Sequence, residues 1–235
     1  MELGRNLLLD DLRKSYDAVF IAIGANVSSK MGIEGENLNG VYGGNELLEY
    51  KKYPDFKEKR VAVIGGGNVA MDTSRTIKRL GAKHVYVIYR RAEEQMPAEK
   101  KEIKEAKEEG IEFMFLNNIV KVLGKEKVEK IECIKTELVY EEGKRPYPVN
   151  IENSNYTLDM DYVVMAIGSK LEKDSVEQIE KNDWDKLKVD DNYRTSLKGV
   201  YAGGDVAGVK STVAWASFSG REAAKKIYED LSEEK

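Results

Sequence analysis

Residues 60–72 read RVAVIGGGNVAMD. A run of β-forming residues leads into three consecutive glycines, and the small and apolar residues that follow have the spacing of a helix. Within the stretch, Gly65-x-Gly67-x-x-Ala70 matches the GxGxxG/A pattern of a strand–turn–helix that binds a dinucleotide. The first glycine permits the tight turn, the second lets the backbone approach a pyrophosphate, and the small third residue lets helix and strand pack closely.

The sequence around this stretch predicts a βαβαβ nucleotide-binding half, because runs of β-forming residues alternate with segments of helical periodicity that end at glycines. The expected strands cover residues 60–65, 84–91 and 111–116, and the expected helices cover residues 68–80 and 98–110. Charged residues of the second helix form i,i+4 pairs, Lys101 with Glu105 and Lys104 with Glu108. Such pairs are typical of a solvated face, and a partner-binding face is the alternative.

The end of the second expected strand indicates which dinucleotide is bound. A site for NAD or FAD places Asp or Glu there to hold the ribose hydroxyls. This strand instead ends Tyr89-Arg90-Arg91 and has no acidic residue from His84 onward, so NADPH is favoured over NADH, because guanidinium groups bind a 2′-phosphate that a carboxylate would repel. The alternative is two surface arginines after a strand. The predicted NADPH-binding residues are Gly65, Gly66, Gly67, Asn68, Val69, Ala70, Arg90 and Arg91.

Three other segments predict buried strands of an α/β sheet: YDAVFIAIGAN (16–26), MDYVVMAIGSK (160–170) and GVYAGGDVAG (199–208). The first two share Ala-Ile-Gly, which indicates equivalent positions in two related domains. Residues 119–160 alternate between apolar and polar types and carry turn signals, so they predict an antiparallel meander added to the parallel sheet.

The last expected helix covers residues 211–231, with Ser211 or Thr212 as its N-cap. Its first half consists largely of small residues, which leave room for a ligand or for tight packing of the helix against a sheet. The sequence does not separate these two interpretations.

Composition excludes several classes of function. The 235 residues carry a formal charge of −4, which argues against a nucleic-acid partner or an acidic membrane surface. The single cysteine, Cys133, is expected to be a buried small hydrophobe and rules out a CxxC redox pair within this chain. The single histidine, His84, opens a strand and gives no support to a hydrolytic triad. No signal peptide or membrane-spanning run is present, and a cytoplasmic location is expected.

With these features in place, the sequence resembles the small (β) subunit of NADPH-dependent glutamate synthase. The resemblance rests on VIGGGNVAMDTSRT, VYVIYRRAEEQMPA and AKEEGIEF, and it continues through YDAVFIAIGA, IEGENLNGVYGGNELL, VVMAIG and RTSLKGVYAGGD. It covers essentially the whole chain. That family is similar to the flavin–NADPH region of dihydropyrimidine dehydrogenase and to the large subunit of ferredoxin–NADP transhydrogenases.

The resemblance implies an FAD-binding domain interrupted by an inserted NADPH-binding domain. RTSLKGVYAGGD resembles the second FAD motif of the family, in which the carboxylate matching Asp205 binds the ribityl chain and the glycines matching Gly203 and Gly204 admit the pyrophosphate. The N-terminus of the last helix, at Thr212 and Val213, would point toward the flavin. The two Ala-Ile-Gly turns add Ile23, Gly24 and Gly168 to the expected cofactor-binding residues.

One departure from the family pattern concerns the ADP half of FAD. The family holds it with a separate GxGxxG segment near the start of the FAD domain, whereas only 15 residues precede YDAVF here. The expected fold is therefore a Rossmann-like α/β domain for NADPH with an antiparallel meander, inserted in an incomplete FAD-binding α/β domain. The expected boundaries are 1–56 for the first part of the FAD domain and its connector, 57–165 for the NADPH domain and 166–235 for the second part. We therefore expect FAD binding by this chain to be weak or absent. The chain could be a truncated piece, the product of a mis-started reading frame or one part of a split subunit, and the sequence does not decide among these.

The resemblance implies a function in which hydride passes from NADPH to FAD and electrons pass onward to iron–sulfur centres on a partner. Glutamate itself would form on a large partner subunit. The cofactors carry this chemistry, so no acid–base residue is nominated. A ferredoxin–NADP transhydrogenase-like electron-transfer subunit and a non-catalytic NADP-binding fragment are the alternatives. A disulfide reductase of the thioredoxin reductase kind is excluded for lack of a cysteine pair.

Overall fold

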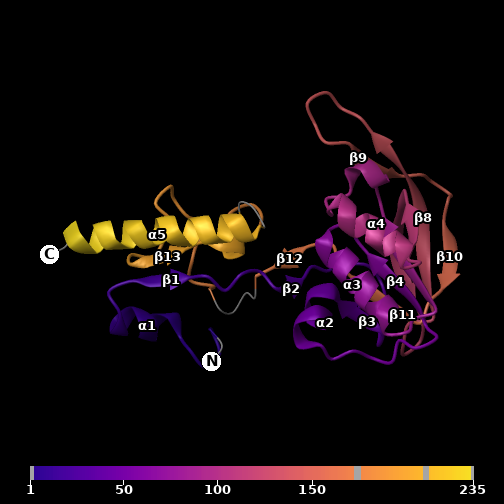
Figure 1. Cartoon of the computed structure of the whole chain (residues 1–235), viewed down its shortest axis with the longest axis horizontal. Coiled ribbons are helices and arrows are strands. Elements are labelled where there is room, and N and C mark those ends of the chain that lie inside the picture. Colours follow the sequence, from indigo (N-terminus) through magenta and orange to yellow (C-terminus); the bar gives the residue numbers. More distant parts are fainter. Residues whose placement is uncertain (1–2, 172–175, 209–211, 234–235) are drawn as a thin grey trace. The chain divides into compact units, whose positions relative to one another are not determined.

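The structure, a computed structural model, describes residues 3–171, 176–208 and 212–233 and divides into two compact units. Residues 28–169 form one unit, called the inserted unit below. Residues 1–27 together with 170–235 form the other, called the split unit. The chain thus leaves the split unit, builds the inserted unit and returns, which is the interrupted arrangement expected (Figure 1).

The inserted unit is built on a five-stranded parallel sheet with the order β3-β11-β4-β5-β6. Its strands are β3 (Val41–Gly43), β4 (Arg60–Ile64), β5 (His84–Tyr89), β6 (Glu112–Phe115) and β11 (Tyr162–Met165). Its helices are α2 (Gly44–Tyr50), α3 (Asn68–Arg79) and α4 (Lys100–Glu108), with the short 3₁₀ helix η1 (Glu93–Gln95) after β5. In register, Val63 of β4 lies beside Val87 of β5 and Val164 of β11. The expected βαβαβ unit is therefore confirmed.

A second, antiparallel sheet belongs to the same unit. It comprises β7 (Asn117–Leu123), β8 (Lys130–Val139), β9 (Tyr147–Asn150) and β10 (Tyr156–Asp159). β8 is the central strand: β7 pairs along one edge, and β10 and β9 share the other, with β10 against residues 130–133 and β9 against residues 136–139. The expected antiparallel strands are present, but β10 returns to β8 and does not pair with β9 as a continuing meander would require.

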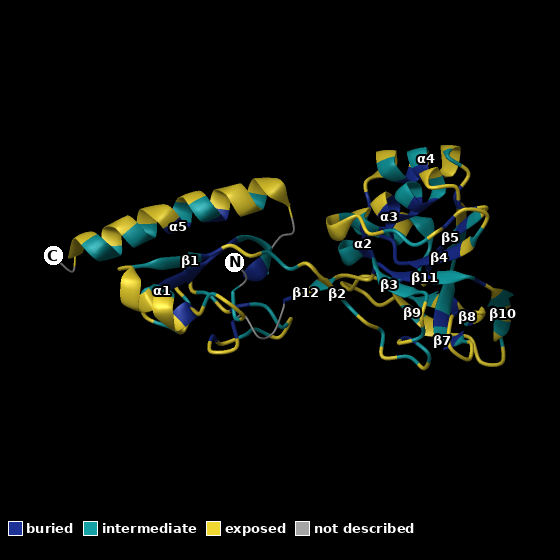
Figure 2. Ribbon diagram, turned by 90° about the horizontal axis from the view of Figure 1, so that it is seen from below, coloured by how far each residue is buried: buried dark blue, intermediate teal, exposed yellow. Residues whose placement is uncertain are grey.

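Both faces of the parallel sheet are covered. Figure 2 shows α2, α3 and α4 on one side of it and the antiparallel sheet on the other. Along β4, Val61 and Val63 pack with Met71 and other residues on the helix side, whereas Ala62 and Ile64 pack with the antiparallel sheet. A strand buried on both faces needs a continuous apolar run, which is why RVAVI shows no polar alternation.

The split unit has a thinner framework. Its strands β1 (Val19–Ile21) and β13 (Val200–Ala202) pair in parallel, with Val19 beside Val200, and α1 (Leu9–Ser15) precedes β1. After β13 come the 3₁₀ helix η3 (Gly204–Val206) and the long helix α5 (Val213–Glu233). Of the helix residues described, only Ser219 and Ala223 are buried, and Figure 2 shows most of α5 exposed or half-exposed.

The structure divides into its two units at 27/28 and 169/170, whereas the sequence suggested domain boundaries at 56/57 and 165/166. Residues 28–56 contain β3 and α2, and β3 pairs in parallel with β11 of the inserted unit, Val41 lying beside Val163. The two crossings of the chain are the short strands β2 (Val27–Ser28) and β12 (Ser169–Lys170), which pair with each other. The β1 and β11 segments, which share Ala-Ile-Gly, fall in different units as expected.

The structure also describes the single cysteine, the single histidine and the N-cap of the last helix. Cys133 is fully buried in β8, and burial raises the pKa of its thiol to about 12. His84 begins β5 and lies 3.0 Å from Glu112 near the surface. Of the two proposed N-caps of the last helix, Ser211 lies outside the described residues, whereas Thr212 Oγ1 accepts a hydrogen bond from the Trp215 N–H at 3.2 Å.

Candidate cofactor sites

The glycine turn between β4 and α3 is enforced by close packing at its first two residues. Gly65 has φ +139°, and a Cβ there would lie 2.2 Å from the carbonyl oxygen of Ala166. A Cβ on Gly66 would lie 2.7 Å from ring atoms of Tyr89. At Gly67 the nearest atom to a Cβ would be Pro97 Cγ at 3.9 Å, an ordinary van der Waals contact, so this position is much less crowded than the first two. This less crowded position is the one at which the pattern predicts a pyrophosphate.

Residues 68–70 begin α3 behind this turn, and their side chains do not line the space in front of it. Ala70 is fully buried, which lets the helix pack on the sheet, and Val69 packs against the same core. Asn68 Oδ1 accepts a hydrogen bond from the Glu99 N–H at 3.0 Å, which ties the start of α3 to the start of α4. Any ligand contact of Asn68 or Val69 would therefore be made by backbone N–H groups at the helix N-terminus, whereas the Ala70 N–H already donates to the carbonyl of Gly67 at 3.0 Å.

The glycine turn opens on a hollow of about 430 Å³ at the carboxyl ends of β4, β5 and β11, where ligands of parallel sheets bind. It brings together the predicted glycines, both predicted arginines and Gly168 from the second Ala-Ile-Gly turn. The lining residues are Met31, Ile64, Gly65, Gly66, Gly67, Ile88, Tyr89, Arg90, Arg91, Pro97, Asn117, Asn118, Arg145, Ala166, Ile167 and Gly168. No carboxylate is among them.

The two arginines that follow β5, Arg90 and Arg91, differ in their hydrogen bonding. The strand ends at Tyr89, so Arg90 and Arg91 lie just beyond it and not within it as expected. Arg90 is exposed, and within the described part of the chain its guanidinium makes no hydrogen bond or ion pair. Arg91 Nε donates to the carbonyl of Pro146 at 3.1 Å. Beneath them, Tyr89 is buried and its hydroxyl donates to the carbonyl of Gln95 at 2.8 Å.

Sequence reasoning missed Arg145, Asn117 and Asn118, which line the same hollow. Arg145 lies in the connection between β8 and β9, and its guanidinium donates to the carbonyl of Gln95. No local pattern marks this residue, because only the pairing of β8 with β9 brings it to the end of β5.

A second hollow, of about 340 Å³, lies in the split unit at the carboxyl ends of β1 and β13. It gathers most of the residues that the family resemblance assigns to FAD. Its lining residues are Phe20, Ala22, Gly24, Gly203, Gly204, Asp205, Thr212, Val213 and Ala216. Ile23, also expected to bind a cofactor, is not among them and has 41% of its surface exposed.

Close packing around Gly203 leaves little room for a side chain at this position of the second hollow. A Cβ on Gly203 would lie 2.9 Å from Phe20 Cζ and 3.0 Å from Ser219 Oγ. Ser219 Oγ accepts from the Gly204 N–H at 2.9 Å and donates to the Ala216 carbonyl at 3.0 Å, which fixes the turn against α5. The N-terminal end of α5 faces this turn, and Val213 has 88% of its surface exposed.

The electrostatics of the second hollow include a lysine that sequence reasoning did not single out. Burial lowers the pKa of Lys186, while the nearby Asp205 and Asp185 carboxylates oppose that shift. A Cβ on Gly208 would lie 2.5 Å from Lys186 Cγ, so the glycine makes room for the lysine stem. Lys186 thus places a positive charge near Asp205 at this end of the unit.

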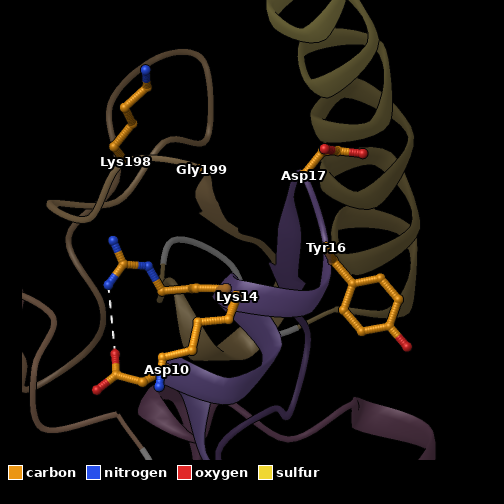
Figure 3. A pocket seen from close by; sticks show the side chains of 7 residues that line it. Asp10, Lys14, Tyr16, Asp17, Lys198 and Gly199 are labelled. Atoms are coloured by element: carbon orange, nitrogen blue, oxygen red, sulfur yellow. Dashed lines mark ion pairs between the residues drawn. The ribbon is translucent and has the colours of Figure 1, made fainter.

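A third hollow, of about 360 Å³, lies at the opposite end of the same strands and is lined by residues of α1 together with Tyr16, Asp17, Lys198 and Gly199. Figure 3 shows that Tyr16 and Asp17 are directed away from Lys198, and that the ion pair drawn joins Arg13 to Asp10 at 3.5 Å. Its charged groups do not converge on one point. It also lies at the amino ends of β1 and β13, the edge that parallel sheets do not use for ligands.

The geometry of two glycine-lined hollows, each at the carboxyl edge of a parallel sheet, agrees with a family assignment that covers residues 6–223. The chain belongs to the pyridine nucleotide-disulphide oxidoreductase family. The α/β fold class is likewise confirmed by solved structures. FprA of Mycobacterium tuberculosis in complex with NADPH has a TM-score of 0.84 at 19% identity, over 99% of this chain and 68% of that one. T. acidophilum thioredoxin reductase has a TM-score of 0.70 at 23% identity, over 91% and 66% of the two chains.

Among curated relatives, the glutamate synthase [NADPH] small chain of Escherichia coli (strain K12) is 37% identical, over 96% of this chain and 53% of the relative. The NADP(+)-dependent formate dehydrogenase subunit beta of Moorella thermoacetica is 36% identical over 233 residues, 95% of this chain and 33% of the relative. The expected resemblance to glutamate synthase small subunits is confirmed. The chain spans about half the length of the first of these relatives and a third of the second.

The described residues contain no group of three or more His, Cys, Asp or Glu side chains arranged to hold a metal ion. None of their helices is long and apolar enough to cross a membrane.

Proposed function

We propose that this chain is the NADPH-binding portion of a flavin-dependent oxidoreductase that resembles the glutamate synthase small chain. The observation that carries the proposal is the single hollow in which Gly65–Gly67 meet Arg90 and Arg91 without a carboxylate. The relatives that are named for NADPH or NADP(+), among them a glutamate synthase small chain and a formate dehydrogenase subunit, support the choice of cofactor.

The residues of the inserted unit fit NADPH. Gly67 is less crowded than Gly65 and Gly66, which suits close approach of a pyrophosphate, and the N-terminus of α3 supplies N–H groups and partial positive charge beside it. Arg90 and Arg91 supply donors suited to a 2′-phosphate at the end of β5. Ala166, Ile167 and Gly168, which follow the neighbouring strand β11, also line the hollow.

The residues of the split unit fit part of a flavin site. Gly203 and Gly204 allow close approach of a ligand to the backbone, Asp205 offers a carboxylate acceptor, and Thr212 caps a helix whose N-terminus favours negative charge. When the cofactors are bound, NADPH supplies a hydride and the flavin accepts it. The protein contributes binding, orientation and the electrostatics of the helix N-terminus.

The proposal includes a multi-subunit setting. The formate dehydrogenase relative and the Geobacter sulfurreducens NADPH-Fe(3+) oxidoreductase relative are both named as beta subunits. We place this chain in such a complex, with iron–sulfur centres or a large subunit of glutamate synthase type as acceptor. A ferredoxin–NADP transhydrogenase-like subunit would have the same site and a different acceptor.

A substitution at the less crowded glycine, Gly67, tests the cofactor site. Gly67→Asp has room for its side chain, so the fold should persist, but the carboxylate would stand where the pyrophosphate is expected. We expect NADPH binding, measured by calorimetry, to weaken at least about tenfold. Lys104→Gln, on the solvated face of α4, changes the net charge equally and should leave binding unchanged. Unchanged binding in Gly67→Asp would refute the site.

A second candidate, a non-catalytic NADP-binding module, is favoured by the openness of the flavin hollow, where Gly24 has no atom within 4 Å of a Cβ position. The two candidates differ in activity. Purified protein supplied with excess FAD should reduce a dye with NADPH as the donor if the oxidoreductase proposal holds. A protein that binds NADPH but reduces no dye even with excess FAD would establish the binding module.

A further inference from the structure

Three arginines from two distant parts of the chain line the NADPH hollow. Arg90 and Arg91 follow β5, and Arg145 comes from the β8–β9 connection. No Asp or Glu is among the residues that line the hollow, although the whole chain carries a net charge of −4. The pyrophosphate is already provided for by the glycine turn and the N-terminus of α3. Three further positive charges at the end of β5 therefore suit a second anionic group.

Arg145 is exposed at the surface, but its guanidinium is anchored by a hydrogen bond. Its guanidinium donates to the carbonyl of Gln95, the same carbonyl that accepts the Tyr89 hydroxyl at 2.8 Å. Beside it, Arg91 Nε donates to the carbonyl of Pro146 at 3.1 Å. These two bonds fasten the β8–β9 connection to the end of β5 and to η1, so part of the entropy cost of ordering Arg145 is met before a ligand arrives.

The neighbouring Lys144 is exposed as Arg145 is, but its side chain has a different partner. Lys144 pairs with Glu141 at 2.7 Å and does not line the hollow. A guanidinium has five N–H donors, and the bond to Gln95 leaves Arg145 others for a ligand. Forked donors of this kind match a phosphate better than a point charge does.

We propose that Arg145 is a specificity-determining residue that binds the 2′-phosphate of NADP(H), with Arg90 and Arg91 on the other side of the same group. This inference rests on the proposed function, because it assumes that the hollow takes NADPH. It adds a residue outside the strand–turn–helix pattern. The antiparallel sheet thereby acquires a role in cofactor choice as well as in covering the core.

The test compares the dissociation constants of NADPH and NADH, measured by calorimetry on the whole chain, for wild type, Arg145→Ala and Lys144→Ala. A lost charge-assisted hydrogen bond should raise the NADPH constant of Arg145→Ala at least about tenfold and the NADH constant less than about twofold. Lys144→Ala should match wild type for both ligands. Competition by adenosine 2′-monophosphate should weaken in Arg145→Ala as NADPH binding does, whereas competition by adenosine 5′-monophosphate should not change.

The outcomes separate this inference from the proposal beneath it. A wild type that does not prefer NADPH would refute the cofactor assignment and the inference with it. A wild type that prefers NADPH, with Arg145→Ala showing the same preference or losing both ligands equally, would overturn only the role of Arg145. Should Arg145→Ala not fold, Arg145→Lys keeps the charge without the fork and should show an intermediate, NADPH-selective loss.

Discussion

The two units use glycine-lined turns at the carboxyl edge of a parallel sheet, but they surround those turns differently. In the inserted unit the sheet has five strands and is covered on both faces, and a Cβ on Gly65 would lie 2.2 Å from a backbone oxygen. In the split unit two strands and α5 form the framework, and a Cβ on Gly24 would meet nothing within 4 Å. The inserted unit thus holds its site by packing, whereas the split unit offers an open one.

This difference bears on function. The hollow proposed for NADPH lies wholly among residues of the inserted unit, and its glycine turn is braced by Ala166 and Tyr89. The hollow proposed for FAD lies in the split unit beside a helix end at which Val213 is almost fully exposed. We therefore expect NADPH binding to be robust and FAD binding to be weak in this chain.

The largest expected effect comes from replacing matched glycines. Both Gly65 and Gly24 have positive φ, so Ala is strained at either, but only Gly65→Ala also forces a side chain into backbone. We expect Gly65→Ala to lower the free energy of unfolding by about 3 kcal/mol or more, and Gly24→Ala by about 1 kcal/mol. Urea unfolding followed by circular dichroism measures both. Equal losses would remove the distinction between packed and open turns.

A smaller effect is expected from the ion pairs between α3 and α4. Arg75 has 15% of its side chain exposed and pairs with Glu102, Glu105 and Glu109, which the local pairs of α4 did not predict. Arg75→Met should cost about 1–2 kcal/mol of unfolding free energy, because three neighbouring carboxylates lose their common partner. Arg79→Met is the control, because Arg79 is 63% exposed and should cost under about 1 kcal/mol. A costlier Arg79 variant would contradict this account.

Acid should weaken the split unit through one carboxylate on α5. Hydrogen bonds lower the pKa of Asp230 from 3.8 to about 2; the bond from Arg194 has the largest effect and the bond from Tyr201 the next largest. A carboxyl group whose pKa is lower in the folded than in the unfolded state stabilises the fold when the pH is above the unfolded-state pKa. The contribution of Asp230 is therefore present above about pH 4 and is lost as the pH falls toward 2. Both tryptophans, Trp184 and Trp215, belong to the split unit, and their fluorescence can follow its unfolding.

The matched variant for this acid effect is Asp230→Asn. It should lower the urea midpoint of the fluorescence transition at pH 6 and reduce the difference between the midpoints at pH 6 and pH 3. A wild-type midpoint that does not change between these pH values would count against the Arg194–Asp230 contact as a source of stability.

The smallest expected effect is a low rate of reaction of the Cys133 thiol with a disulfide reagent. Cys133 is fully buried in β8, and burial raises its pKa to about 12, so little thiolate is available in the folded state. Native protein at pH 8 should react with a disulfide reagent far more slowly than urea-unfolded protein does. Because this only cysteine of the chain lies in the inserted unit, its reactivity reports on that unit as tryptophan fluorescence does on the other. Rapid native labelling would contradict the packing described between the two sheets.

Local patterns predicted the parts of the fold whose signals are local. Apolar runs and glycine stops placed β4, α3, β5, α4 and β6 to within a few residues. The sequence grouped residues 28–56 with the first part of the FAD domain and its connector, whereas β3 pairs with β11 of the inserted unit. Local patterns do not reveal this pairing, because Val41 and Val163 are far apart in sequence. The spacing that identifies a strand does not say which strand lies beside it.

The same limit applies to the site. Gly65, Gly67, Arg90 and Arg91 could be found because the pattern and the end of the next strand lie within one supersecondary unit. Arg145 could not, because its position depends on the hairpin of β8 and β9.

The measurement that tests the account most directly is the ratio of the dissociation constants for NADH and NADPH, in wild type and in the double variant Arg90→Ala/Arg91→Ala. We predict that the wild-type chain binds NADPH more tightly, and that the double variant loses affinity for NADPH much more than for NADH, because the guanidinium groups bind only the cofactor that carries a 2′-phosphate. Equal losses for the two cofactors would contradict the assignment of this hollow to NADPH.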